Sequence, residues 1–245
     1  MNIYQKKLLS SLTLKTLVLT FLFLGLSTIS LSRSTSANVT PRTNKGTENS
    51  EGGATRGDCF YKDQKPLTPL IPKTNNKLEL TLASHPTIFI YVPENTAVGG
   101  EFILKDSSQK VVYEDYVSPL NSQVINSQGI IGIKIPTDQS ELKVGTNYNW
   151  TFRLICESSI REVEGSIQRI NPSADLTKKL QQTPESDRWL IYSEAGIWYE
   201  ALVTLAEQIL SDPNNVKFTS QWQNLLDSVG LNEVSTEPLK QPADE

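Results

Sequence analysis

Residues 147–156, NYNWTFRLIC, decide the fold of this chain of 245 residues. Apolar side chains stand at every second position from Tyr148 to Cys156, and mostly polar ones stand between them. A period of two indicates a strand with one face in a core and the other in water. The same alternation directs the side chain of Cys156 toward that core.

Shorter apolar runs of this kind surround the central strand. The Asp106-Ser107-Ser108-Gln109 stretch predicts a hairpin loop, and residues 142–145 predict the turn into the central strand. Seven or eight short strands at this spacing predict an antiparallel, immunoglobulin-like β-sandwich over residues 58–171. A parallel sheet is not expected, because no segment between the runs has the helical period of a crossover. The runs themselves are 88–92, 102–104, 111–113, 131–135 and 163–167.

After Pro172 the apolar period becomes helical, so residues 172–232 predict a helical subdomain packed on the sandwich. A weak helix is expected over 174–182. Thr183-Pro184 predicts the next helix start, with Thr183 as the N-cap residue. The final stretch, 233–245, reads as a frayed tail.

Two stronger apolar stripes follow within that subdomain. The first runs from Trp198 to Ile209 and should stop near Asp212-Pro213, because proline cannot continue a helix. The second runs from Trp222 to Val229 and should be closed by Gly230 as a C-terminal cap.

A leader of 37 residues indicates export. Three lysines precede the apolar run 17–31, and Thr35-Ser36-Ala37 follows as a small-residue cleavage pattern. This order is typical of a secretory signal peptide, with an uncleaved signal anchor as the alternative. Residues 38–57 hold almost nothing apolar and predict a disordered tether. We therefore expect a protein of the periplasm or cell envelope that meets the membrane only through an uncleaved leader.

Charge and motifs exclude several functions. Losing the four basic residues of the leader takes the net charge from −4 to −8, and an acidic exported protein is not expected to bind nucleic acid. The chain has no phosphate-cradling glycine loop and no Gly-x-Ser-x-Gly or His-Glu-x-x-His motif. A zinc site would lack its usual ligands, since there is one histidine. We expect no cofactor and no metal.

Cys59 and Cys156 are the two cysteines of the chain. In an oxidising compartment such a pair is most simply a disulfide, and two separate buried thiols are the alternative. The bridge would contribute about 4–5 kcal/mol in the chain-entropy model.

Candidate catalytic residues are few, and we predict none. His85 lies between Ser84 and Pro86, where a solvent-facing turn histidine is favoured over a catalytic base. Glu162 and Glu164 share one strand face, which suits solvated strands better than a glycosidase pair.

Four aromatic residues, Trp189, Tyr192, Trp198 and Tyr199, form the other candidate site, a partner surface. Packing between helices and sheet is the favoured alternative. Adjacent residues of a helix cannot face the same way, so Trp198 or Tyr199 is expected to be partly exposed.

Several ordered segments resemble the DUF928 family of cyanobacterial exported proteins. They are Arg56–Cys59, Leu67–Pro72, Phe89–Pro93, Glu101–Leu104, Leu142–Trp150, Cys156, Gly196–Leu202 and Trp222–Leu231. The resemblance implies a cyanobacterial origin, export and no assigned activity or catalytic residues. Residues 185–215 also resemble part of a single tetratricopeptide repeat, with Trp189 in the place of the usual glycine.

Together these observations predict a non-enzymatic exported envelope protein that binds an unidentified protein or envelope ligand. The alternative is an extracytoplasmic hydrolase that acts on cell-wall or polysaccharide material through carboxylates.

Overall fold

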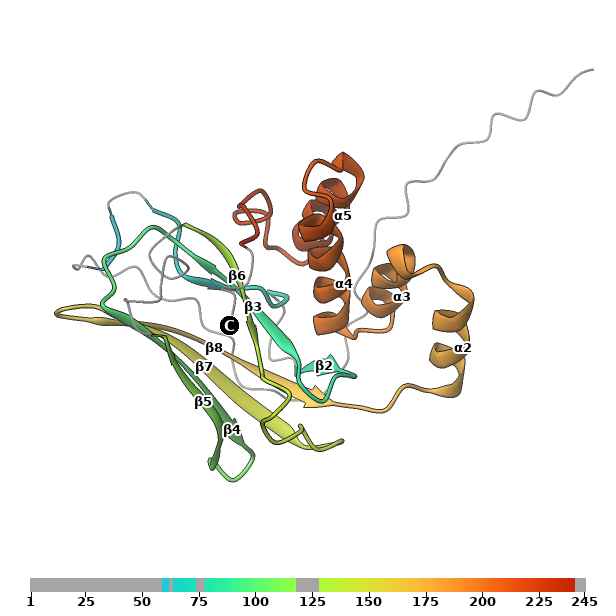
Figure 1. Cartoon of the computed structure of the whole chain (residues 1–245), viewed down its shortest axis with the longest axis horizontal. Helices are drawn as coiled ribbons and strands as arrows, with labels where there is room; N and C mark the ends of the chain where they lie inside the picture. The colour runs from blue at the N-terminus through green and yellow to red at the C-terminus, as the bar shows by residue number, and fades with distance from the viewer. Residues whose placement is uncertain (1–58, 62–63, 74–77, 118–127, 241–245) are drawn as a thin grey trace, which may run out of the picture. The chain divides into compact units, whose positions relative to one another are not determined.

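The computed structural model describes residues 59–61, 64–73, 78–117 and 128–240 (Figure 1). These residues belong to one compact unit, which covers 36–245. The expected leader and tether, and residues 241–245 of the expected tail, lie outside the described residues.

The central strand, β7, lies in the middle of a five-stranded sheet with the order β2-β8-β7-β4-β5. A second sheet has three strands in the order β1-β3-β6, of which β3 and β6 are labelled in Figure 1. The strands of the larger sheet are β2 (Glu79–Thr81), β4 (Gly99–Asp106), β5 (Val111–Val117), β7 (Asn147–Ile155) and β8 (Ile160–Arg169). Those of the smaller sheet are β1 (Thr68–Pro69), β3 (Thr87–Val92) and β6 (Gly129–Lys134). Each apolar run named above falls on a strand, except that β6 ends at Lys134, one residue before the end of the run 131–135.

The expectation of purely antiparallel pairing is wrong for β2. This strand pairs with β8 in parallel, at Glu79–Ile167 and Thr81–Arg169, whereas the other pairs are antiparallel. No crossover helix is needed, because the chain leaves β2 for β3 in the other sheet and returns to β8 only later. The chain is therefore a mixed α/β protein with two sheets.

The apolar sides of both sheets contribute to one core. Its centre is Trp150, which is fully buried and stacks on Phe102 with ring centroids 6.3 Å apart. Gly165 lies opposite Trp150 on β8, and a Cβ atom there would lie 2.4 Å from Cζ2 of the indole. A glycine is thus required for β8 to pass beneath the ring.

The disulfide between Cys59 and Cys156 is present, with the two Cα atoms 5.5 Å apart, and confirms the prediction. Both cysteines are buried. The bridge joins the first described residue to the end of β7, and Thr96 N–H donates to the Cys59 carbonyl oxygen at 2.9 Å. It therefore fastens the start of the domain to its core.

Helices follow the last strand, as expected: α2 (Ala174–Gln182), the 3₁₀ turn η2 (Glu185–Asp187), α3 (Arg188–Glu194), α4 (Trp198–Ser211) and α5 (Val216–Asp227). The start of α2, the end of α4 and the left-handed Gly230 after α5, with φ +84°, agree with the sequence. Thr183 does not cap the next helix. It ends α2 instead, where its hydroxyl donates to the Lys179 carbonyl oxygen at 2.7 Å.

The first turn of α4 contacts both sheets. Trp198 Nε1 donates to the Leu70 carbonyl oxygen at 2.7 Å, and Tyr199 accepts a hydrogen bond from Trp150 Nε1 at 3.0 Å. Both side chains are buried, so the expectation that one is exposed is wrong. The reason is that a helix end with protein on two sides can bury residues that point in different directions.

The expected frayed tail is wrong for residues 233–240. Ile130 of β6 donates to the Pro238 carbonyl oxygen and accepts from Lys240 N–H, both at 2.8 Å. Val234 is buried, and Glu237 forms an ion pair with Lys65. The segment is ordered because it pairs with β6 and buries apolar side chains.

Candidate functional site

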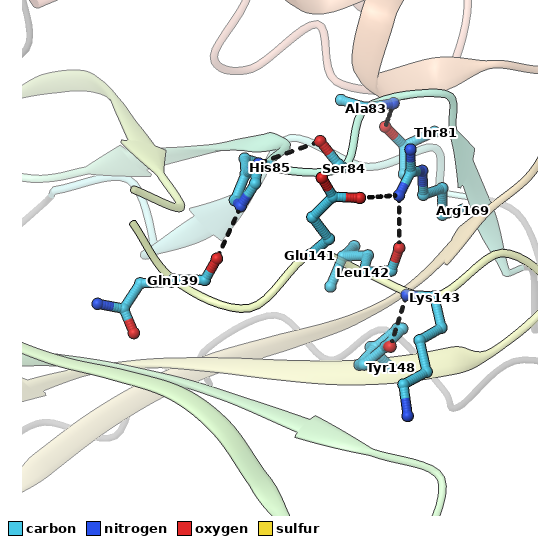
Figure 2. A network of polar contacts seen from close by, with 10 residues as sticks. All are labelled: Thr81, Ala83, Ser84, His85, Gln139, Glu141, Leu142, Lys143, Tyr148 and Arg169. Atoms are coloured by element: carbon cyan, nitrogen blue, oxygen red, sulfur yellow. Dashed lines mark hydrogen bonds and ion pairs between the residues drawn. The ribbon is translucent and has the colours of Figure 1, made fainter. Parts of the chain in front are cut away.

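Polar contacts with neighbouring segments fix the loop between β6 and β7, residues 135–146 (Figure 2). The Gln139 carbonyl oxygen lies 3.0 Å from His85 Nε2, and Leu142 N–H donates to the Ser84 carbonyl oxygen at 3.0 Å. A carbonyl oxygen only accepts, so Nε2 carries the proton. In the neutral ring, Nδ1 then accepts from the Ser84 hydroxyl, 3.0 Å away.

Two further side chains fix the second half of the loop. Arg169 Nη1, at the end of β8, donates to the Leu142 carbonyl oxygen at 2.8 Å and to Glu141 Oε2 at 3.0 Å. Tyr148 of β7 accepts from Lys143 N–H at 2.9 Å (Figure 2). The loop is therefore tied to β7, to β8 and to the turn that precedes β3.

That turn is anchored in its own right by Glu200 from the first turn of α4. Glu200 Oε1 accepts hydrogen bonds from Thr81 Oγ1 at 2.7 Å, Leu82 N–H at 2.7 Å and Ala83 N–H at 2.9 Å. Burial raises the pKa of the Glu200 carboxyl, and these hydrogen bonds lower it by less.

His85 links the turn before β3 to this loop, with both of its ring nitrogens in hydrogen bonds. Both ring nitrogens are engaged, one by Ser84 and one by Gln139. The contacts of His85 therefore join the turn before β3 to the loop between β6 and β7.

The same loop borders two cavities that it shares with β5. The larger, about 530 Å³, is lined by β5 residues 113–115, by Lys134 and by loop residues 136–139. The smaller, about 350 Å³, is lined by Asp106, residues 110–112, loop residues 140–143, Thr146 and Tyr148. We call the residues that line these two cavities the β5 groove. It follows β5 from Val111 to Asp115.

β5 is also the last strand of its sheet. Within the described residues, no strand pairs with its outer edge. On this strand Val111 is 42% exposed and Tyr116 is 56% exposed. An open edge of this kind can add an extended peptide through main-chain hydrogen bonds.

Charge is unevenly distributed along the β5 groove. The larger cavity is lined by Glu114, Asp115 and Asp138 against Lys134, a net charge of −2. In the smaller cavity Asp106 and Glu141 are balanced by two lysines. The groove therefore has one acidic end and one neutral, more apolar end.

The structure places the residues singled out in the sequence away from this groove. Trp189, Trp198 and Tyr199 are buried and Tyr192 is half-buried, so the first three present little surface to a partner. Tyr192 and the first turn of α4 instead contribute to the core that the helices share with the sheets.

Glu162 and Glu164 lie on the exposed face of β8. Glu162 accepts from Arg153 Nε at 2.9 Å, and burial together with the charge of Glu162 raises the pKa of Glu164. Neither glutamate lines the β5 groove. In the described ranges, no group of three or more His, Cys, Asp or Glu is placed to hold a metal ion.

Sequence reasoning missed the β5 groove, because it treated Asp106–Gln109 and residues 142–145 only as turns. One signal was present: Val111, Val112 and Tyr113 form a continuous apolar run at a hairpin, where a half-buried strand would alternate.

In the part of the chain that the structure describes, no helix is long and apolar enough to cross a membrane.

Comparison with known proteins gives one strong match. No curated protein matches the chain. A β-D-glucuronidase of Dictyoglomus thermophilum is similar in structure at 16% identity, over 45% of this chain and 15% of that one, with a TM-score of 0.21. The chain spans only that small share of the enzyme, and a likeness so weak carries no argument about activity. The model of DUF928, described as a domain of unknown function, matches residues 51–239. The chain therefore belongs to the DUF928 family.

Proposed function

We propose that this protein is a non-enzymatic, exported binding module, and that its β5 groove takes an extended segment of another polypeptide. The observation that carries the proposal is the outer edge of β5, with which no strand of the described ranges pairs and which runs beside two cavities. Backbone groups of β5 supply hydrogen bonds to the added strand, and the cavities receive its side chains.

The hydrogen bonds that fix the loop between β6 and β7 support this proposal. A groove binds a peptide more tightly when the loops that line it are already ordered, because ordering them on binding costs free energy. The loop is held by His85, Ser84, Arg169 and Tyr148, and the turn that carries His85 is held by Glu200. The groove is thus formed before a partner arrives.

The test is a selection of extended peptides from a random display library, followed by affinity measurement on two variants. Val111→Lys places a charge on the β5 edge, a substitution that blunts strand addition. Val216→Lys is the matched control, because Val216 is 76% exposed and lies on α5. Selected peptides should lose binding to the first variant and keep it on the second. Equal affinity for both variants would overturn the proposal.

Export is the second part of the proposal and rests on the leader. The mature protein should be recovered from the periplasm or envelope and begin near residue 38 if the leader is cleaved. Mass spectrometry of the native N-terminus tests this. Protein with an intact leader in the soluble cytoplasmic fraction would contradict export.

We further propose that the two sheets form an immunoglobulin-like sandwich. The support is a five-stranded and a three-stranded sheet that share one core, with antiparallel pairing apart from β2. An experimental structure in which the sheets do not face each other would reject this topology.

The alternative function, an extracytoplasmic hydrolase of cell-wall or polysaccharide material, has one observation in its favour. The pKa of Glu164 is raised beside Glu162, as it would be for a general acid. Against it, Glu162 is bound by Arg153 on an exposed face. Polysaccharide hydrolysis that disappears in Glu164→Gln would support the alternative.

A further inference from the structure

We propose that the segment bound in the β5 groove is basic: an extended strand with Lys or Arg at the Asp115 end and apolar side chains at the Val111 end. This inference rests on the proposed function and adds the chemistry of the partner. It comes from the charges along the groove and from what each of them already contacts.

The acidic end holds carboxylates that the described part of the chain leaves without a basic partner. No Lys or Arg among the described residues forms an ion pair with Glu114, Asp115 or Asp138. Other carboxylates do pair with a cation, among them Glu162 with Arg153 and Glu237 with Lys65. Three carboxylates with one lysine beside an open cavity would attract a cationic side chain and repel an anionic one.

The other end of the groove suits apolar side chains. Val111 is exposed there, Val112 packs against the core, and Leu142 and Tyr148 are buried beneath. The carboxylate of Glu141 at this end is bound by Arg169, and its neighbours Lys110 and Lys143 offset the charge of Asp106. A side chain that enters here meets apolar surface without facing a net charge.

Strand addition fixes the relation between the two ends. Successive side chains of an added strand point to opposite faces, so every second residue points into the groove. The basic and the apolar side chain must therefore be separated by an even number of positions along the bound segment. A partner with basic and apolar residues in this relation fits, whereas one with acidic residues there is repelled.

The experiment compares two heptapeptides with blocked ends, which carry Val at positions 1 and 3, Ser at the even positions, and either Lys or Glu at positions 5 and 7, so that the apolar and charged side chains share one face. Binding to the purified protein is measured by calorimetry at low and at high salt. The Lys peptide should bind about tenfold more tightly than the Glu peptide, as expected for two partly screened charge pairs. The difference should shrink at high salt.

Two double variants locate the effect. Asp115→Asn with Asp138→Asn should weaken the Lys peptide by about tenfold. Asp227→Asn with Glu233→Gln, both at exposed positions outside the groove, should leave its affinity unchanged. Equal affinity for the two peptides, or a Lys peptide unaffected by the first variant, would overturn the inference. If library peptides still bind at β5 irrespective of charge, the inference fails while the proposed function stands.

Discussion

Replacing Gly165 by alanine should destabilise the protein by about 2–4 kcal/mol. A Cβ atom at this position would lie 2.4 Å from Cζ2, 2.6 Å from Cε2 and 2.9 Å from Nε1 of Trp150. Distances below 3 Å are not tolerated, so the indole has to move. Overpacking of a core costs about 1–3 kcal/mol. Losing the hydrogen bond from Trp150 to Tyr199 costs about 1 kcal/mol more.

The assay is urea unfolding followed by tryptophan fluorescence, with the free energy of unfolding extrapolated to water. Repeating the substitution in a Trp150→Phe variant makes the test specific to the contact between residue 165 and Trp150. In Trp150→Phe, the smaller ring leaves space for the new methyl group, so Gly165→Ala should cost at least 1 kcal/mol less there, by the usual size of coupling between touching residues of about 0.5–3 kcal/mol. The reasoning is refuted if Gly165→Ala costs under about 0.5 kcal/mol, the level of a surface substitution. Equal costs in the two backgrounds would refute it as well.

Three further predictions follow from named contacts. Burial raises the pKa of the Glu200 carboxyl, so the native state binds the proton of this carboxyl more tightly than the unfolded state does. The resulting stabilisation is fully present below the pKa that Glu200 has in the unfolded state. It is lost as the pH rises through the higher pKa that Glu200 has in the native state. Urea unfolding across this pH range should show the fall in the native protein and a flatter profile in Glu200→Gln. Reducing the Cys59–Cys156 bridge, which closes 97 positions, should lower the free energy of unfolding by about 4–5 kcal/mol, measured with and without reductant; no loss would contradict its role. Val234→Ala should cost about 1–3 kcal/mol, whereas the exposed Val216→Ala should cost almost nothing; equal costs would mean that the tail is not docked.

The larger elements were predictable because their signals are long. β7 alternates over its whole length, and α4 repeats an apolar stripe for more than three turns. Such patterns reflect one buried face, which the sequence records directly. The disulfide followed from chemistry, since an expected export and a pair of cysteines were enough to predict it.

The missed features depend on contacts between distant segments. β2 is three residues long and buried throughout, so it offers no alternation, and its parallel partner lies far along the chain. The stretch 234–240 is short and mostly polar, so it carries no strand pattern, yet its Leu239 pairs with Ile130 of β6. Tyr199 is buried because a sheet residue, Trp150, meets it.

The candidate site was out of reach of sequence reasoning for the same cause. The β5 groove joins a hairpin strand to a loop that starts about 20 residues later, and neither has a motif. Two residues that bond to this loop, His85 and Arg169, come from still other parts of the chain. Only the folded chain brings an open strand edge, two cavities and an acidic end together.

The central claim is that an extended peptide adds to β5. Hydrogen exchange of the backbone amides of residues 111–115, compared with and without a selected peptide, tests it most directly. We expect the amides on the outer edge of β5 to become protected, together with those of loop residues 137–143, while α5 remains unchanged. Protection confined to another part of the protein, with β5 exchanging as before, would contradict the account.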